Sequence, residues 1–173
     1  YIVDGGTTGI GIESTVLDVT HEPPVILRPG GVTKEMLEEV IGTVIEPTHD
    51  EQKIESTPKA PGMKYTHYAP EAPVYLIDET ANIELAVTTL QQQGHKVALL
   101  APRTYAHSTA DYFFTFGDEH NQYQMGANLD DALRSCDKTD ATIILATATS
   151  KKGVGSAIMN RLEKASGEKW YKF

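Results

Sequence analysis

Cysteine is nearly absent from this 173-residue chain, and long apolar runs are missing altogether. The single cysteine, Cys136, has no partner for an internal disulfide and no second thiol for a metal site, which suits a reducing compartment. No stretch approaches the roughly 20 apolar residues needed to cross a bilayer, and the first residues lack the basic-then-apolar pattern of a secretory signal. We therefore expect a cytoplasmic protein with no membrane partner.

Positive charge is also in short supply. The chain has 15 Lys and Arg residues against 24 Asp and Glu residues, and most of the acidic excess lies in residues 1–73, which carry 5 basic and 12 acidic side chains. Affinity for phosphate backbones comes mainly from clustered Lys and Arg, so this composition disfavours direct binding of a nucleic acid. We expect any link to RNA to be indirect.

Two further absences limit the chemistry. No histidine lies at metal-ligand spacing from cysteines or carboxylates; the histidines are His21, His49, His67, His95, His107 and His120. The chain also lacks a G-x-S-x-G elbow and any nucleophile with a matching base. The sequence therefore predicts no metal site held by the chain and no covalent hydrolase, and Cys136 is interpreted as a small apolar residue packed in a helix.

The first part of the chain predicts three short strands, at residues 1–3, 14–18 and 25–27. Thr33 is suited to N-cap a helix whose apolar residues fall on one face and which ends at Gly42. These few elements cannot enclose a core, so they need a missing N-terminal partner or docking onto the rest of the chain. Because the chain also starts on the apolar run Tyr1–Val3, we expect a fragment of a longer protein.

Residues 46–73 lack apolar periodicity and are punctuated by prolines, which is typical of a linker. From residue 74 to 173 the pattern becomes regular. Strands predicted at 74–77, 97–101, 112–116 and 141–145 alternate with helices predicted at 83–93, 129–135 and 155–165. This alternation indicates an α/β fold, a small Rossmann-like doubly wound domain with a parallel sheet covered on both faces.

Four stretches carry side chains suited to ligands. Residues 5–15 combine glycines with hydroxyls that suit an amino acid or a phosphate, although such turns are also common in ordinary hairpins. Arg28 ends an apolar strand, where it is suited to bind phosphate oxygens bidentately or to form a surface ion pair.

Residues 61–70 crowd tyrosines, a histidine and a lysine between prolines, which fits either a packed strap or a lid over a polar pocket. Residues 147–156 place hydroxyls and lysines between a strand and a helix. They suit an anion site or, as we favour, a plain connection.

Taken in order, the blocks at residues 4–6, 11–18, 26–31 and 61–70 resemble the threonylcarbamoyl-AMP synthase family. The resemblance implies three parts: residues 1–45 as the incomplete C-terminal end of a YrdC-type α/β catalytic domain, residues 46–73 as a linker or lid, and residues 74–173 as the Rossmann-like accessory domain. Residues 153–162 are similar to the last helix of that domain.

The family joins L-threonine, bicarbonate and ATP to give threonylcarbamoyl-AMP and pyrophosphate, with Mg²⁺ accompanying ATP. The product supplies the group that downstream proteins attach to adenosine 37 of tRNA. By resemblance, Ser14 contacts threonine and Arg28 contacts ATP. The lid residues are Lys64, Tyr65, His67 and Tyr68.

Two departures from the family pattern qualify this reading. The Lys/Arg strand motif and the Ser-x-Asn motif of the catalytic domain have no counterpart here, so the fragment alone is expected to be inactive. Thr66 stands where many relatives place Arg, so no cationic role is carried over to that position. The alternative function is a non-enzymatic Rossmann-like module that senses a nucleotide or binds a partner.

Overall fold

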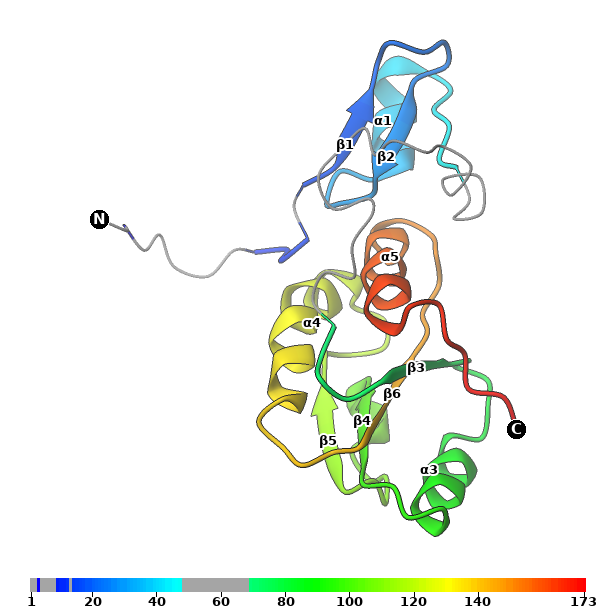
Figure 1. Cartoon of the computed structure of the whole chain (residues 1–173). Coiled ribbons are helices and arrows are strands. Elements are labelled where there is room, and N and C mark those ends of the chain that lie inside the picture. Colours follow the sequence, from blue (N-terminus) through cyan, green and yellow to red (C-terminus); the bar gives the residue numbers. More distant parts are fainter. Residues whose placement is uncertain (1–2, 4–8, 13, 48–68) are drawn as a thin grey trace.

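The computed structural model describes residue 3 and residues 9–12, 14–47 and 69–173 (Figure 1). The larger part is built on a four-stranded parallel sheet in the order β3-β6-β4-β5. Its strands are β3 (Val74–Ile77), β4 (Val97–Ala101), β5 (Tyr112–Thr115) and β6 (Ile143–Thr147). Every residue of β4 and β6 is buried, as expected for central strands covered on both faces.

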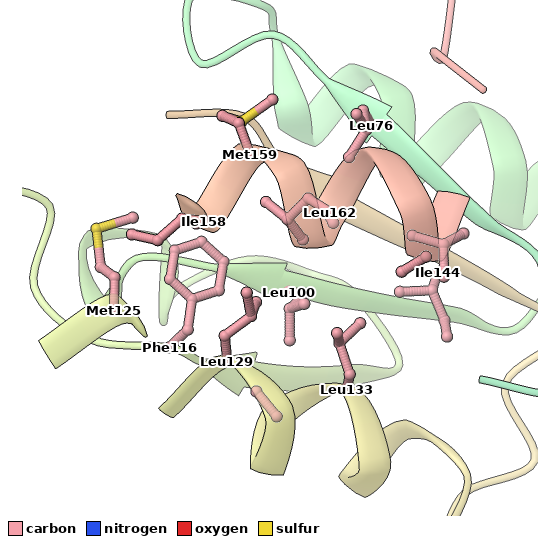
Figure 2. Packing of buried hydrophobic residues seen from close by; sticks show 14 of the residues in the cluster. Leu76, Leu100, Phe116, Met125, Leu129, Leu133, Ile144, Ile158, Met159 and Leu162 are labelled. Atoms are coloured by element: carbon pink, nitrogen blue, oxygen red, sulfur yellow. The ribbon is translucent and has the colours of Figure 1, made fainter. Parts of the chain in front are cut away.

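Helices cover both faces of this sheet. The α3 helix (Ile83–Gln92) packs on one face, in a core that includes Leu99 of β4 and Leu145 of β6. The α4 helix (Gln122–Cys136) and the α5 helix (Val154–Ser166) pack on the other face, where Leu129 and Leu162 meet the sheet (Figure 2). The predicted α/β fold with a Rossmann-like, doubly wound sheet is therefore confirmed.

The edge of β3 is covered by the C-terminal segment rather than by another strand. The amide of Leu76 donates to the carbonyl of Lys169 at 2.8 Å, and the amide of Tyr171 donates back to the carbonyl of Leu76 at 2.7 Å. An unpaired strand edge is a template for pairing with other chains, so this segment protects the edge.

Several sequence-based boundaries need correction. The helix predicted at 129–135 begins earlier, at Gln122, because the Asn121 side chain accepts from the Gln124 amide and Met125 is buried. Its polar first turns and Gly126 resembled a loop. The strand predicted at 141–145 lies two residues later, at Ile143–Thr147, and β5 ends at Thr115 because Phe116 turns into the core.

The N-terminal part contains a small antiparallel sheet of β1 (Val16–Asp18) and β2 (Val25–Arg28), followed by the α1 helix (Lys34–Ile41). Thr33 caps α1 by accepting from the Met36 amide at 3.3 Å, and Gly42 ends the helix with a φ of 78°, as predicted. The strand predicted at 14–18 begins two residues later. Of the strand predicted at 1–3, only Val3 is described, and it is 92% exposed.

The apolar face predicted for α1 is not buried in this structure. The helix contains no buried residue, and Val40 is 83% exposed. The N-terminal part lies beside α5 (Figure 1), where Glu35 of α1 accepts from the Gly153 amide at 3.4 Å. Docking onto the rest of the chain was one of the two arrangements that the sequence required of these elements.

The described residues contain no helix that is long and apolar enough to cross a bilayer.

Candidate functional site

The two residues that the sequence assigned to substrates lie side by side. Arg28 ends β2, and in the β1–β2 register it lies opposite Val16, two residues after Ser14. The Arg28 Nε donates a hydrogen bond to the carbonyl oxygen of Ser14 at 3.0 Å. This bond holds the guanidinium beside the Ser14 backbone, and Ser14 is exposed. Their assignment to threonine and ATP remains a prediction.

The loop after Arg28 closes tightly against this pair. A Cβ on Gly30 would lie 2.5 Å from the Thr15 amide nitrogen and 2.6 Å from the Ser14 carbonyl carbon, closer than real side chains approach. The Thr15 hydroxyl donates to the Val32 carbonyl at 2.8 Å and accepts from the Val32 amide at 3.2 Å. Thr15, one of the hydroxyls considered for ligand binding, therefore serves to hold the loop.

Positive charge gathers on the α5 side of Arg28. The pKa of Lys164 is lowered, mainly by burial and then by the neighbouring Arg161 and Arg28 guanidinium groups. Mutual repulsion among cations of this kind is relieved when an anion binds between them. The α5 helix thus brings Lys164 close enough to Arg28 for the two charges to interact.

The loop between β6 and α5, residues 148–153, and the start of α5 are held by polar contacts with other parts of the chain. The Gly155 amide donates to Gln122 Oε1 at 3.1 Å, and the Lys151 ammonium pairs with Glu163 at 2.7 Å. Two carboxylates of the N-terminal part also reach the start of α5: Glu35 accepts from the Gly153 amide at 3.4 Å, and Glu46 accepts from the Ser156 hydroxyl. The loop is therefore a docking point for the N-terminal part, and the choice between an anion site and a plain connection for residues 147–156 stays a prediction.

Glu35 gives this docking contact a pH dependence. The pKa of Glu35 is held below its ordinary value. The main cause is the hydrogen bond from its own backbone N–H, to which hydrogen bonds from Thr33 and Gly153 add, against the opposing effect of burial. A folded-state pKa below the unfolded value gives stability at neutral pH that is lost as the pH falls through the folded-state pKa.

We accordingly expect Glu35→Gln to lower the free energy of unfolding at pH 7 by up to about 0.5 kcal/mol, because the carboxylate is largely exposed. The difference from wild type should shrink as the pH falls below about 4 and the wild-type carboxyl becomes protonated. Urea denaturation at pH 7 and at a pH below about 4 measures this difference. Glu39→Gln, on the exposed face of α1, is the control. An unchanged difference at both values would assign the effect to packing.

Cys136 lies where the sequence interpretation placed it. It is 3% exposed in α4, and its thiol donates to the Ala132 carbonyl at 3.5 Å. Burial first, and then the nearby Asp137, raise the pKa of this thiol to about 12. The group stays protonated at neutral pH and acts as an apolar filler, as predicted.

The lid residues Lys64, Tyr65, His67 and Tyr68 lie outside the described residues, so their role stays a prediction. In the part of the chain that is described, no group of three His, Cys, Asp or Glu residues is arranged to hold a metal ion.

Sequence reasoning missed how the N-terminal part contacts α4. Ile12 is 2% exposed and belongs to the same core as Met125 and Leu129, and Gly11 approaches the backbone of Gly126. A signal was present: a glycine inside a helix costs stability relative to alanine, so Gly126 marked a position of close packing.

The fold and this site define a Rossmann-like α/β unit joined to a strand-and-loop region that places Ser14 and Arg28 together. The family model described as "Threonylcarbamoyl-AMP synthase, C-terminal domain" matches residues 32–167. The threonylcarbamoyl-AMP synthases of Pyrococcus abyssi and Bacillus subtilis are each 44% identical to the chain over 96% of its length, and that of Schizosaccharomyces pombe is 33% identical over 95%.

A solved structure supports the same relationship. The Sua5 protein of P. abyssi, crystallised with L-threonine, superposes with a TM-score of 0.86 at 43% identity, covering 98% of this chain and 50% of that protein. The chain belongs to the threonylcarbamoyl-AMP synthase family and corresponds to its C-terminal part. It spans about half the length of the curated relatives that it matches, 49% of the P. abyssi protein and 48% of the B. subtilis protein.

Proposed function

We propose that the chain is the C-terminal part of an L-threonylcarbamoyladenylate synthase, which makes threonylcarbamoyl-AMP and pyrophosphate from L-threonine, bicarbonate and ATP. The observation that carries the proposal is 44% identity over 96% of the chain to synthases of two distant organisms. The bond that joins Arg28 to Ser14 supports it, because the reaction needs an amino-acid site next to a phosphate site.

The proposed reaction is an adenylyl transfer. The threonine amine condenses with bicarbonate to a carbamate with loss of water, and a carbamate oxygen attacks the α-phosphorus of ATP while the bond to pyrophosphate breaks. Mg²⁺ enters as part of the ATP substrate. When bound, the ion would neutralise charge on the phosphates.

The candidate site residues each have a proposed role in this reaction. Ser14 binds threonine through its exposed hydroxyl, and Arg28 binds the phosphates of ATP, with its plane set by the bond to the Ser14 carbonyl. Lys164 and Arg161 on α5 add positive potential where negative charge moves onto pyrophosphate. The P. abyssi protein bound to L-threonine supports threonine as the amino acid.

The product places the protein in tRNA modification at adenosine 37 in the cytoplasm, with tRNA contacted by downstream transfer proteins. The formal net charge of -9 supports this indirect relation, because direct binding of a phosphate backbone requires clustered cations.

Single-turnover formation of threonylcarbamoyl-AMP from ATP, bicarbonate and labelled threonine tests the proposal. The comparison is between residues 1–173 alone and the family-length protein, meaning these residues together with the N-terminal half that the relatives carry. We expect product from the family-length protein and none from residues 1–173, because the motifs of the catalytic domain that bind nucleotide lie outside this sequence. No product from either form would contradict the proposal.

A further inference from the structure

The contact between α4 and the segment before Ser14 is a close backbone approach. A Cβ on Gly126 would lie 2.9 Å from Ile12 Cδ1 and 3.0 Å from the Ile10 carbonyl oxygen. On the other side, a Cβ on Gly11 would lie 2.7 Å from Ala127 Cα, and Gly11 has a φ of +75°. Two glycines facing each other thus allow the N-terminal segment to lie directly on the helix.

Burial fixes the segment at this point. Ile12 is 2% exposed and joins the apolar core formed by α4, α5 and the sheet, with Ile10 packed against the same core. A fully buried isoleucine in a closely packed core has little freedom to shift, because interiors have few voids. Ile12 is therefore an anchor held by the accessory domain rather than by β1 or β2.

Ser14 follows this anchor by two residues, which limits its distance from Ile12 to about 7 Å. On its other side, the Ser14 carbonyl accepts from Arg28, and Gly30 closes against it. The position of Ser14 is thus set from two directions, by the β1–β2 region and by α4. The backbone of Arg28 is placed by β2, whose Ile26 amide donates to the Ile45 carbonyl at 2.8 Å, and only its guanidinium is linked to Ser14.

We infer that Gly126 of the accessory domain positions the threonine-binding Ser14 by receiving Ile12 on the surface of α4. The inference rests on the proposed role of Ser14 and gives the accessory domain a specific task, control of threonine affinity. It makes Gly126 a positioning residue, since it contacts Ile12 and Ile10 and not the substrate.

The test is the KM of the family-length protein for threonine and, separately, for ATP. In Gly126→Ala the new methyl group displaces Ile12, so we expect the threonine KM to rise about five- to tenfold. The ATP KM should rise less, by up to about threefold, because Arg28 keeps its place on β2 and is linked to Ser14 only through its guanidinium. Asn128→Ala, an exposed change on the same helix, is the matched control and should leave both values unchanged.

A second variant identifies the contact. Ile12→Val removes the Cδ1 atom, the nearest of the three that the new Cβ meets, and leaves Ile12 Cγ1 and the Ile10 carbonyl oxygen at 3.0 Å. The double variant Gly126→Ala with Ile12→Val should therefore recover part of the lost threonine affinity. Additive effects would overturn the inference, as would equal rises of the two KM values. If Gly126→Ala does not fold, Ile12→Ala breaks the same contact without a clash and should raise the threonine KM selectively, and its failure to do so would also overturn the inference.

Ser14→Ala separates this inference from the proposed function. A higher threonine KM in Ser14→Ala with no change in Gly126→Ala would overturn the positioning role alone. An unchanged threonine KM in Ser14→Ala would remove Ser14 from threonine binding, and with it the inference, while synthesis of threonylcarbamoyl-AMP by the wild-type protein would still support the proposed reaction.

Discussion

Arg28→Ala in the family-length protein should lower the single-turnover rate of threonylcarbamoyl-AMP formation by about 30- to 1,000-fold, equivalent to about 2 to 4 kcal/mol of transition-state stabilisation. Arg28 lies at the end of β2, and the 3.0 Å hydrogen bond from its Nε to the Ser14 carbonyl fixes the plane of the guanidinium. Charge that develops on the departing pyrophosphate needs such a preorganised cation. Rapid-quench measurement with saturating ATP separates this loss from weaker ATP binding.

Two variants sharpen the interpretation. Arg28→Lys keeps the positive charge but loses the planar fork, so it should recover only part of the rate. Arg103→Ala removes an exposed arginine that follows β4 and pairs with Asp118 at 3.3 Å, and it should leave the rate unchanged. A wild-type rate in Arg28→Ala would exclude Arg28 from the mechanism.

Phe116→Ala should lower the free energy of unfolding by about 3 to 5 kcal/mol. Phe116 is 0% exposed and directly follows β5, and Figure 2 shows its ring among Met125, Leu129 and Ile158. Removing the ring leaves a cavity between α4, α5 and the sheet, and a packed interior closes such a cavity only in part. Urea denaturation followed by circular dichroism measures the loss.

Phe173→Ala is the matched control for the same change of residue. Phe173 is 68% exposed and makes an edge-on ring contact with Tyr171 at 5.4 Å, so its loss should cost no more than about 0.5 kcal/mol. Similar losses in the two variants would mean that the core around Phe116 rearranges to fill the space.

The parallel sheet was predictable because its signals are local. Strands β3 and β4 have the predicted bounds, since their apolar runs are short and are bounded by Pro, Asp and Gly residues. The start of α4 was not predictable in this way. Its first turns contain Gly126 and several polar residues, and they form a helix because Asn121 caps them and Met125 is buried against distant parts of the chain.

The candidate site divides in the same manner. Ser14 and Arg28 were identified from their blocks of sequence, and their proximity follows from the pairing of β1 with β2. The docking of Glu35 onto Gly153 joins residues 118 positions apart, and no sequence spacing indicates such a contact.

The sequence by itself indicated the α/β class, the family and the residues proposed to bind threonine and ATP, because apolar periodicity, turn residues and short motifs are local features of the chain. Only the tertiary structure decided that Ile12 packs in the core formed by α4, α5 and the sheet, and that Lys164 of α5 lies near Arg28. Those relations depend on shape and distance between segments that meet only after folding, where a single glycine on α4 leaves the space that another segment fills.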